Sequence, residues 1–324
     1  MKKVSYKYRQ FLFFLIKLSI VLGAFYFIFQ KTVHNNSISL SEFILQLEKI
    51  FTNNYNAVFI LLSFTFFNWF FEILKWKNLV TIIKNIPFIE ALKQSLGSLT
   101  ASLFTPNRIG EYGAKAFYFY KEQRKKILLL NLISNISQMT VTVVFGIVGL
   151  LFIVFNYAID LPVFRARRLV YYLAILFLSI FGAQFFISKK IRGFYFNKIV
   201  LFFKELPIFV IVKTMLFSII RYLIFSHQFY YLLLLFGVEM DYNILIRLIF
   251  TMYLIASVIP SLPMFDWLIK GSVAVFVFGL VGVNELVVVS ITTLMWLLNF
   301  AIPAIIGSYF VMNFKFLTVT NRKY

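Results

Sequence analysis

The sequence contains no cysteine and only two histidines among its 324 residues. The absence of cysteine excludes disulfide bonds, thiol catalysis and thiolate metal sites. His34 and His227 have no pair of carboxylates near them at metal-ligand spacing, so we expect ordinary structural roles for both. A phosphate-binding loop of the G-x-x-x-x-G-K-[ST] type is also missing, and direct use of ATP by this chain is not expected. The sequence predicts no metal and no cofactor.

Charged residues are scarce. They make up 14% of the chain, whereas a soluble domain carries about a quarter. Hydrophobic residues make up 61% of the chain and the mean hydropathy is +0.87. No polar block is long enough to fold as a separate soluble domain. We therefore predict an all-α, polytopic membrane protein with a single membrane domain over residues 1–324, so that any activity takes place in or at the bilayer.

Acidic residues are few relative to basic ones, with 12 Asp and Glu against 32 Lys and Arg and a net charge of +20. The basic residues lie mostly in short clusters beside apolar runs. This distribution indicates membrane topology and anionic or phosphate-bearing lipids as partners, and argues against nucleic acid. We expect a multi-pass protein of the cell (inner or cytoplasmic) membrane with both termini in the cytoplasm. The sequence leaves open whether it forms a homo-oligomer.

Six apolar runs are long enough to be predicted as full spans. They cover residues 11–29, 55–74, 127–155, 170–187, 213–237 and a last run that ends near residue 314. Two amphipathic segments, 37–52 and 194–207, are predicted to lie on the membrane interface. This topology places three arginines in an outer loop, against the positive-inside rule; they are Arg165, Arg167 and Arg168.

Residues 98–116, SLTASLFTPNRIGEYGAKA, combine membrane depth with groups that an uninterrupted lipid-facing helix does not hold. Charged side chains and unpaired backbone groups both cost several kcal/mol in hydrocarbon. Basic clusters flank the segment on both sides, so it enters and leaves from one face of the membrane. We predict a broken, re-entrant hairpin with Pro106 and Gly110 as structural hinges. A pair of full spans remains an alternative, because the number of crossings has the same parity.

A similar arrangement recurs about 155 residues later, within residues 244–280. With this shift Glu111 aligns with Asp266, and Lys115 aligns with Lys270. Prolines break the later copy as well, at Pro260 and Pro263. Each unit crosses the membrane three times, so the second unit starts on the opposite face. The sequence therefore predicts an inverted-topology repeat with halves of approximately 1–160 and 161–324, as in many transporters.

The spacing acid-x-x-x-Lys has a physical meaning in both hairpins. Residues i and i+4 share one face of a helix, so each pair neutralises itself at depth and can open when a lipid headgroup competes. Arg108 is expected to offer a guanidinium fork to a phosphate. The predicted substrate-binding residues are therefore Arg108, Glu111, Lys115, Asp266 and Lys270. The alternative is that the two pairs only stabilise buried hairpins and bind no ligand.

A polar stripe lies on the third predicted span, where Asn131, Asn135 and Gln138 are four and three residues apart. This stripe either faces the first hairpin or forms hydrogen bonds between helices.

The segments LFTPNRIGEYGAKAFYF and SLPMFDWLIKGSVAVFVF resemble the lysylphosphatidylglycerol synthetase transmembrane-region family, a flippase-like domain family, over essentially the whole chain. The first family motif is matched by Pro106, Arg108, Gly110 and Glu111. In the second motif Pro260, Pro263 and Asp266 fit, whereas Met264 and Phe265 replace the usual glycine pair. The resemblance implies a bilayer-embedded domain that moves modified phospholipids between leaflets. Since the chain ends soon after its last predicted span, we expect no aminoacyl transferase domain.

These observations favour a lipid flippase-like protein, not an enzyme, that translocates a phospholipid or a lipid-linked substrate. Two alternatives stay open. One is an integral membrane transferase acting on a lipid carrier, which consumption of a soluble donor by the purified protein would reveal. The other is an accessory subunit, in which apolar residues could replace the charged hairpin residues without loss beyond assembly.

Overall fold

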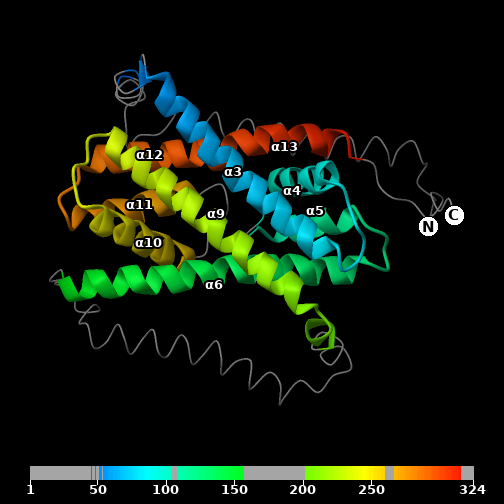
Figure 1. The fold of residues 1–324 in the computed structure, drawn as a ribbon. Coiled ribbons are helices and arrows are strands. Elements are labelled where there is room, and N and C mark those ends of the chain that lie inside the picture. The colour runs from blue at the N-terminus through cyan, green and yellow to red at the C-terminus, as the bar shows by residue number, and fades with distance from the viewer. Residues whose placement is uncertain are drawn as a thin grey trace, which may run out of the picture.

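The computed structural model describes Leu45, Glu48 and residues 51–52, 54–103, 105, 108–156, 201–259 and 266–314. Every regular element within these ranges is helical (Figure 1). Several predictions fall outside the described residues: the spans 11–29 and 170–187, most of the interfacial segment 37–52, the first part of the segment 194–207, the three arginines of the predicted outer loop, His34 and the prolines Pro106, Pro260 and Pro263.

Four helices are long and apolar enough to cross a membrane. They are α3 (Tyr55–Val80), α6 (Arg124–Asn156), α9 (Ile208–Leu235) and a continuous run formed by α12 (Glu285–Trp296), the π-helical turn η3 (Leu297–Ala301) and α13 (Ile302–Met312). At 1.5 Å per residue these helices are about 39–50 Å long, which exceeds the roughly 30 Å of a hydrocarbon core. Four of the six predicted spans are thus confirmed as helices of membrane-spanning length.

The remaining helices are shorter and come in two pairs. One pair is α4 (Phe88–Ser102) with α5 (Ile109–Phe117), and the other is α10 (Tyr242–Val258) with α11 (Asp266–Gly279). Their lengths of about 13–26 Å are too short for any one of them to cross the hydrocarbon core. In Figure 1 the two pairs lie at opposite ends of the long helices, α4 and α5 on the right and α10 and α11 on the left.

The order of the helices is the same in the two halves of the described chain. A long helix (α3 or α9) is followed by a short pair and then by a second long helix, which is α6 in the first half and the α12–α13 run in the second. The short helices exchange partners between the halves, because α4 packs on α13 whereas α10 packs on α6 (Figure 1). Through this exchange each half of the described chain packs against the other.

A glycine allows the close approach at each of these two contacts. A Cβ on Gly307 of α13 would overlap the carbonyl oxygen of Leu96 and the hydroxyl of Thr100. In the same way, a Cβ on Gly149 of α6 would overlap the carbonyl oxygen of Arg247 and lie 2.7 Å from the hydroxyl of Thr251. Each threonine follows its carbonyl by four residues, so the two contacts use the same arrangement of glycine, carbonyl and hydroxyl.

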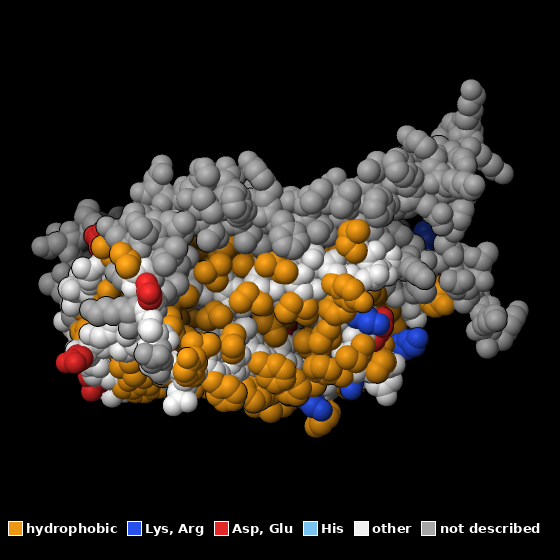
Figure 2. Space-filling model, turned by 90° about the horizontal axis from the view of Figure 1, so that it is seen from above, with side chains coloured by type: hydrophobic (Ala, Val, Ile, Leu, Met, Phe, Trp, Pro, Cys, Tyr) orange, Lys and Arg blue, Asp and Glu red, His pale blue; other side chains and the backbone are white. Residues whose placement is uncertain are grey.

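The surface has the distribution of polarity expected in a bilayer. Large apolar side chains such as Phe59, Phe155, Phe209 and Tyr309 are more than two-thirds exposed, and apolar side chains cover much of the face shown in Figure 2. Basic residues gather beside α4 and α5, where Lys84 and Lys121 lie in the loops and Arg124, Lys125 and Lys126 begin α6. Acidic residues gather beside α10 and α11, where the chain carries Glu239, Asp241 and Glu285.

Candidate substrate-binding cavity

A cavity of about 430 Å³ lies where the two short pairs meet the long helices. Its charged lining consists of Glu72, Lys75, Arg108, Glu111, Arg221, Asp266 and Lys270. Four of the five predicted substrate-binding residues are therefore on the wall of one cavity, although they come from different halves of the chain. Arg108 and Glu111 arrive from the first pair, and Asp266 and Lys270 from the second.

The fifth predicted residue, Lys115, lies behind the cavity wall. Its side chain is 1% exposed and lines a small adjoining recess. Its Nζ donates hydrogen bonds to Glu111 Oε1 at 2.7 Å and to Asn131 Oδ1 at 2.8 Å, and it lies 4.2 Å from the centre of the Trp76 ring. Lys115 thus holds Glu111 in place from behind and is not open to a ligand in this conformation.

Both acid–lysine pairs form, each with a distance of 2.7 Å between nitrogen and oxygen. The self-neutralisation predicted from the spacing is confirmed. The pairs differ in access, because the side chains of Glu111 and Lys115 are 9% and 1% exposed whereas those of Asp266 and Lys270 are 28% and 39% exposed. The pair on α11 can be reached by a ligand, whereas the pair on α5 is part of the packed interior.

Arg108 has an unusual backbone conformation. It lies at the start of α5 with φ 57° and ψ 29°, and it is the sole non-glycine residue with positive φ among the residues described. Such a conformation costs about 1–3 kcal/mol in a residue with a Cβ. Beside it, the Gly110 N–H donates to Thr105 Oγ1 at 2.8 Å, and a Cβ on Gly110 would come within 2.9 Å of the Ala101 carbonyl. The tight, strained turn directs Arg108 to the cavity wall.

Two replacements of Arg108 distinguish the effect of backbone strain from the effect of the lost charge, because both remove the guanidinium group and only one tolerates the backbone conformation. Asparagine tolerates the left-handed conformation and alanine does not, so Arg108→Asn should unfold at a higher temperature than Arg108→Ala, with a difference of about 1 kcal/mol. Thermal unfolding of the two purified variants in the same detergent measures this difference. Equal unfolding temperatures would show that the turn carries no such strain.

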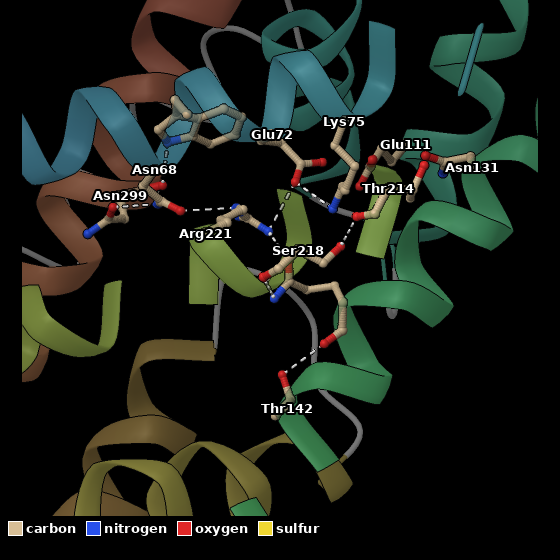
Figure 3. Close-up of polar contacts among 12 residues, drawn as sticks. Asn68, Glu72, Lys75, Glu111, Asn131, Thr142, Thr214, Ser218, Arg221 and Asn299 are labelled. Atoms are coloured by element: carbon tan, nitrogen blue, oxygen red, sulfur yellow. Dashed lines mark hydrogen bonds and ion pairs between the residues drawn. The ribbon is translucent and has the colours of Figure 1, made fainter. Parts of the chain in front are cut away.

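The charged network deepest in the cavity was not predicted from the sequence (Figure 3). The Glu72 carboxylate of α3 lies 2.7 Å from Lys75 Nζ on the same helix and 3.1 Å from Arg221 Nη1 on α9. Arg221 also donates to Asn68 Oδ1 at 3.0 Å and to Gln138 Oε1 at 3.2 Å. The available signal was an acid three residues before a lysine inside an apolar helix. The span predicted over residues 55–74 in fact continues to Val80, so Lys75 lies inside the helix and not at its end.

A proline explains how Asn299 joins this network. Pro303 has no N–H, so the carbonyl of Asn299 four residues earlier has no α-helical i+4 donor. That carbonyl accepts a hydrogen bond from Trp69 Nε1 at 3.1 Å. The Asn299 side chain lies in the π-helical turn, where its Oδ1 accepts from Asn68 at 2.7 Å (Figure 3). Its Nδ2 donates to Gln228 at 2.8 Å. The π-helical turn therefore forms part of the cavity wall. Single π-helical turns are frequent at functional sites.

The polar stripe of α6 faces the first helical pair and also forms hydrogen bonds between helices, so both sequence interpretations are confirmed. Asn131 accepts from Lys115, and Asn135 Nδ2 donates to the Tyr112 hydroxyl at 2.9 Å. Gln138, one turn further along, binds Arg221 instead. The stripe thus connects α5 to the network of α3 and α9.

The residues described contain no group of three or more histidines and carboxylates that could hold a metal ion. His227 makes local contacts, with its ring nitrogens 2.8 Å from the Leu223 carbonyl and 2.9 Å from the Tyr242 hydroxyl. Neither protein-family models, nor curated proteins, nor solved structures gave a match to this chain.

Proposed function

We propose that this protein moves a phospholipid or a lipid-linked substrate between the leaflets of a membrane, with the headgroup passing through the charged cavity. The observation that carries the proposal is the convergence of Arg108 and Glu111 with Asp266 and Lys270 on one cavity, from two short helical pairs at opposite ends of the long helices. Charged groups at membrane depth are costly. Their presence there therefore favours a role in binding a ligand or conducting an ion.

The proposed architecture is an inverted repeat of two re-entrant hairpins. The matching order of helices and the exchanged packing of α4 and α10 support it, as does the length of the short helices. The basic residues beside α4 and α5 favour a cytoplasmic location for that end. The acidic residues beside α10 and α11 agree with a location of the other end on the outside. The resemblance of the hairpin sequences to the lysylphosphatidylglycerol synthetase transmembrane-region family agrees with this function.

In this mechanism the acyl chains remain in lipid while the headgroup exchanges water for the polar lining. Arg108 contacts the headgroup phosphate with its planar donors. The half-exposed pair of Asp266 and Lys270 opens, and each partner then binds a headgroup charge of the opposite sign. Because the Asp266–Lys270 pair closes again once the headgroup has left, neither of its two charges stays unpaired between transport events.

The test is the translocation of a fluorescent phospholipid in reconstituted vesicles, followed with a membrane-impermeant quencher. Asp266→Asn combined with Arg108→Asn removes two charged contacts and should slow translocation at least about tenfold, since a charged hydrogen bond contributes about 1.5–3 kcal/mol. Lys121→Gln, an exposed loop change outside the cavity, is the matched control. Wild-type rates in a double variant that is inserted and elutes as a single species would rule the mechanism out.

A further inference from the structure

The charges around the deep part of the cavity do not balance. Two carboxylates, those of Glu72 and Glu111, lie among four cations, and the four are Lys75, Arg108, Lys115 and Arg221. The Asp266–Lys270 pair on the opposite wall is neutral as a unit. Within the described residues the cavity and its adjoining recess therefore carry a net charge of +2.

The excess comes from two arginines. Each lysine lies 2.7 Å from its own carboxylate, Lys75 from Glu72 and Lys115 from Glu111, so each of these pairs is neutral as a unit. The remaining cations are Arg108, which has no ion pair among the residues described, and Arg221, which shares Glu72 with Lys75. A guanidinium group stays protonated in proteins, so the charges of both arginines are permanent.

A buried hydrogen-bond donor on the cavity wall lacks an acceptor. The indole N–H of Trp267 has no partner, although Trp267 is 4% exposed and lines the cavity. The Nδ2 of Asn131 also has no partner, but Asn131 is not part of the cavity lining. An unpaired donor together with an excess of positive charge favours an anionic acceptor as the ligand.

From this count we infer that the cavity recognises a phosphate monoester, the common phosphate group that carries close to two negative charges at neutral pH, and not a phosphodiester with one. Arg108 and Arg221 both border the recess beside the cavity, and two guanidinium forks match the several oxygens of one phosphate. The assignment rests on the proposed function, since it concerns the ligand of the same cavity. The monoester belongs to a lipid headgroup or to a soluble phosphate compound.

The test compares phosphatidic acid, a lipid monoester, with phosphatidylglycerol, a lipid diester, by their binding to the purified full-length protein at pH 7. We expect phosphatidic acid to bind at least about tenfold more tightly, because one more charged contact is made. Arg221→Gln leaves Glu72 paired with Lys75 and lowers the net charge to +1, so this ratio should fall toward one. Lys121→Gln makes the same change in charge outside the cavity and should keep the wild-type ratio.

Equal affinities for the two lipids in the wild-type protein would overturn the assignment. A preference that survives in Arg221→Gln would also overturn it, since headgroup size would then be the cause. If phosphatidic acid is preferred and the preference depends on Arg221, competition with glycerol 3-phosphate identifies the source of the phosphate. Displacement of phosphatidic acid indicates a soluble phosphate compound, and a lack of displacement indicates a lipid. A monoester preference without translocation in vesicles would refute only the proposed function, and translocation without that preference would refute only this assignment.

Discussion

Replacement of Glu72 by leucine is expected to destabilise the protein by about 3–5 kcal/mol. The change leaves Lys75 and Arg221 without their carboxylate, in a region where Lys75 is 1% exposed. Uncompensated buried charge is among the most expensive defects in a folded interior. The midpoint of thermal unfolding in detergent, measured for protein purified from the membrane fraction, reports the loss.

Lys75→Met provides the matched comparison. Methionine has a similar length, and Glu72 retains Arg221 at 3.1 Å, so the cost should be below about 1.5 kcal/mol. The asymmetry follows from the structure, because one carboxylate serves two cations. Similar losses in Glu72→Leu and Lys75→Met would show that Glu72 and Arg221 are not coupled.

Gly307→Leu is expected to disrupt the seam between α13 and α4, at a cost of about 3 kcal/mol. The new side chain would meet the backbone carbonyl of Leu96, and the Thr100 hydroxyl that now donates to the Ala304 carbonyl at 2.7 Å. Neither group can move without shifting α4, which leads directly into the turn at Arg108. We expect a lower yield of folded protein and a lower unfolding temperature.

Gly113→Ala is the control for that substitution. Gly113 lies inside α5, where a Cβ would have no neighbour within 4 Å. Alanine should therefore be neutral or stabilise the protein by up to about 1 kcal/mol, through the higher helix propensity of alanine. If Gly307→Leu were tolerated as well as Gly113→Ala, the packing of α4 on α13 would be wrong.

Several charged residues of the cavity could be predicted from the sequence, because charged side chains are rare in the apolar segments that surround them. In an apolar helix Arg108, Glu111 and Lys115 are visible as exceptions, and their helical spacing gives the ion pair directly. The same reasoning identified Asp266 and Lys270. It could not establish that Lys115 is enclosed, since burial depends on Trp76 and Asn131, which approach from other helices.

The partners of Glu72 and Asn299 could not be predicted in the same way. Glu72 and Lys75 are close in sequence, but Arg221 reaches them from a helix about 150 residues later. The Asn299 carbonyl is freed by Pro303, a local signal, yet its acceptance of the Trp69 N–H depends on how α3 packs against the π-helical turn. Contacts of this kind are decided by packing and not by spacing.

The sequence by itself determined the class of the protein, the four described apolar spans and the two self-paired charge sets, because hydrophobicity and helical periodicity act along the chain. Only the tertiary structure decided that Arg108 and Asp266 border the same cavity and that Arg221 shares a carboxylate with Lys75. The physical reason is that the net charge of a cavity is a property of neighbours in space, and those neighbours come from four helices, α3, α5, α9 and α11, that the chain order does not place side by side.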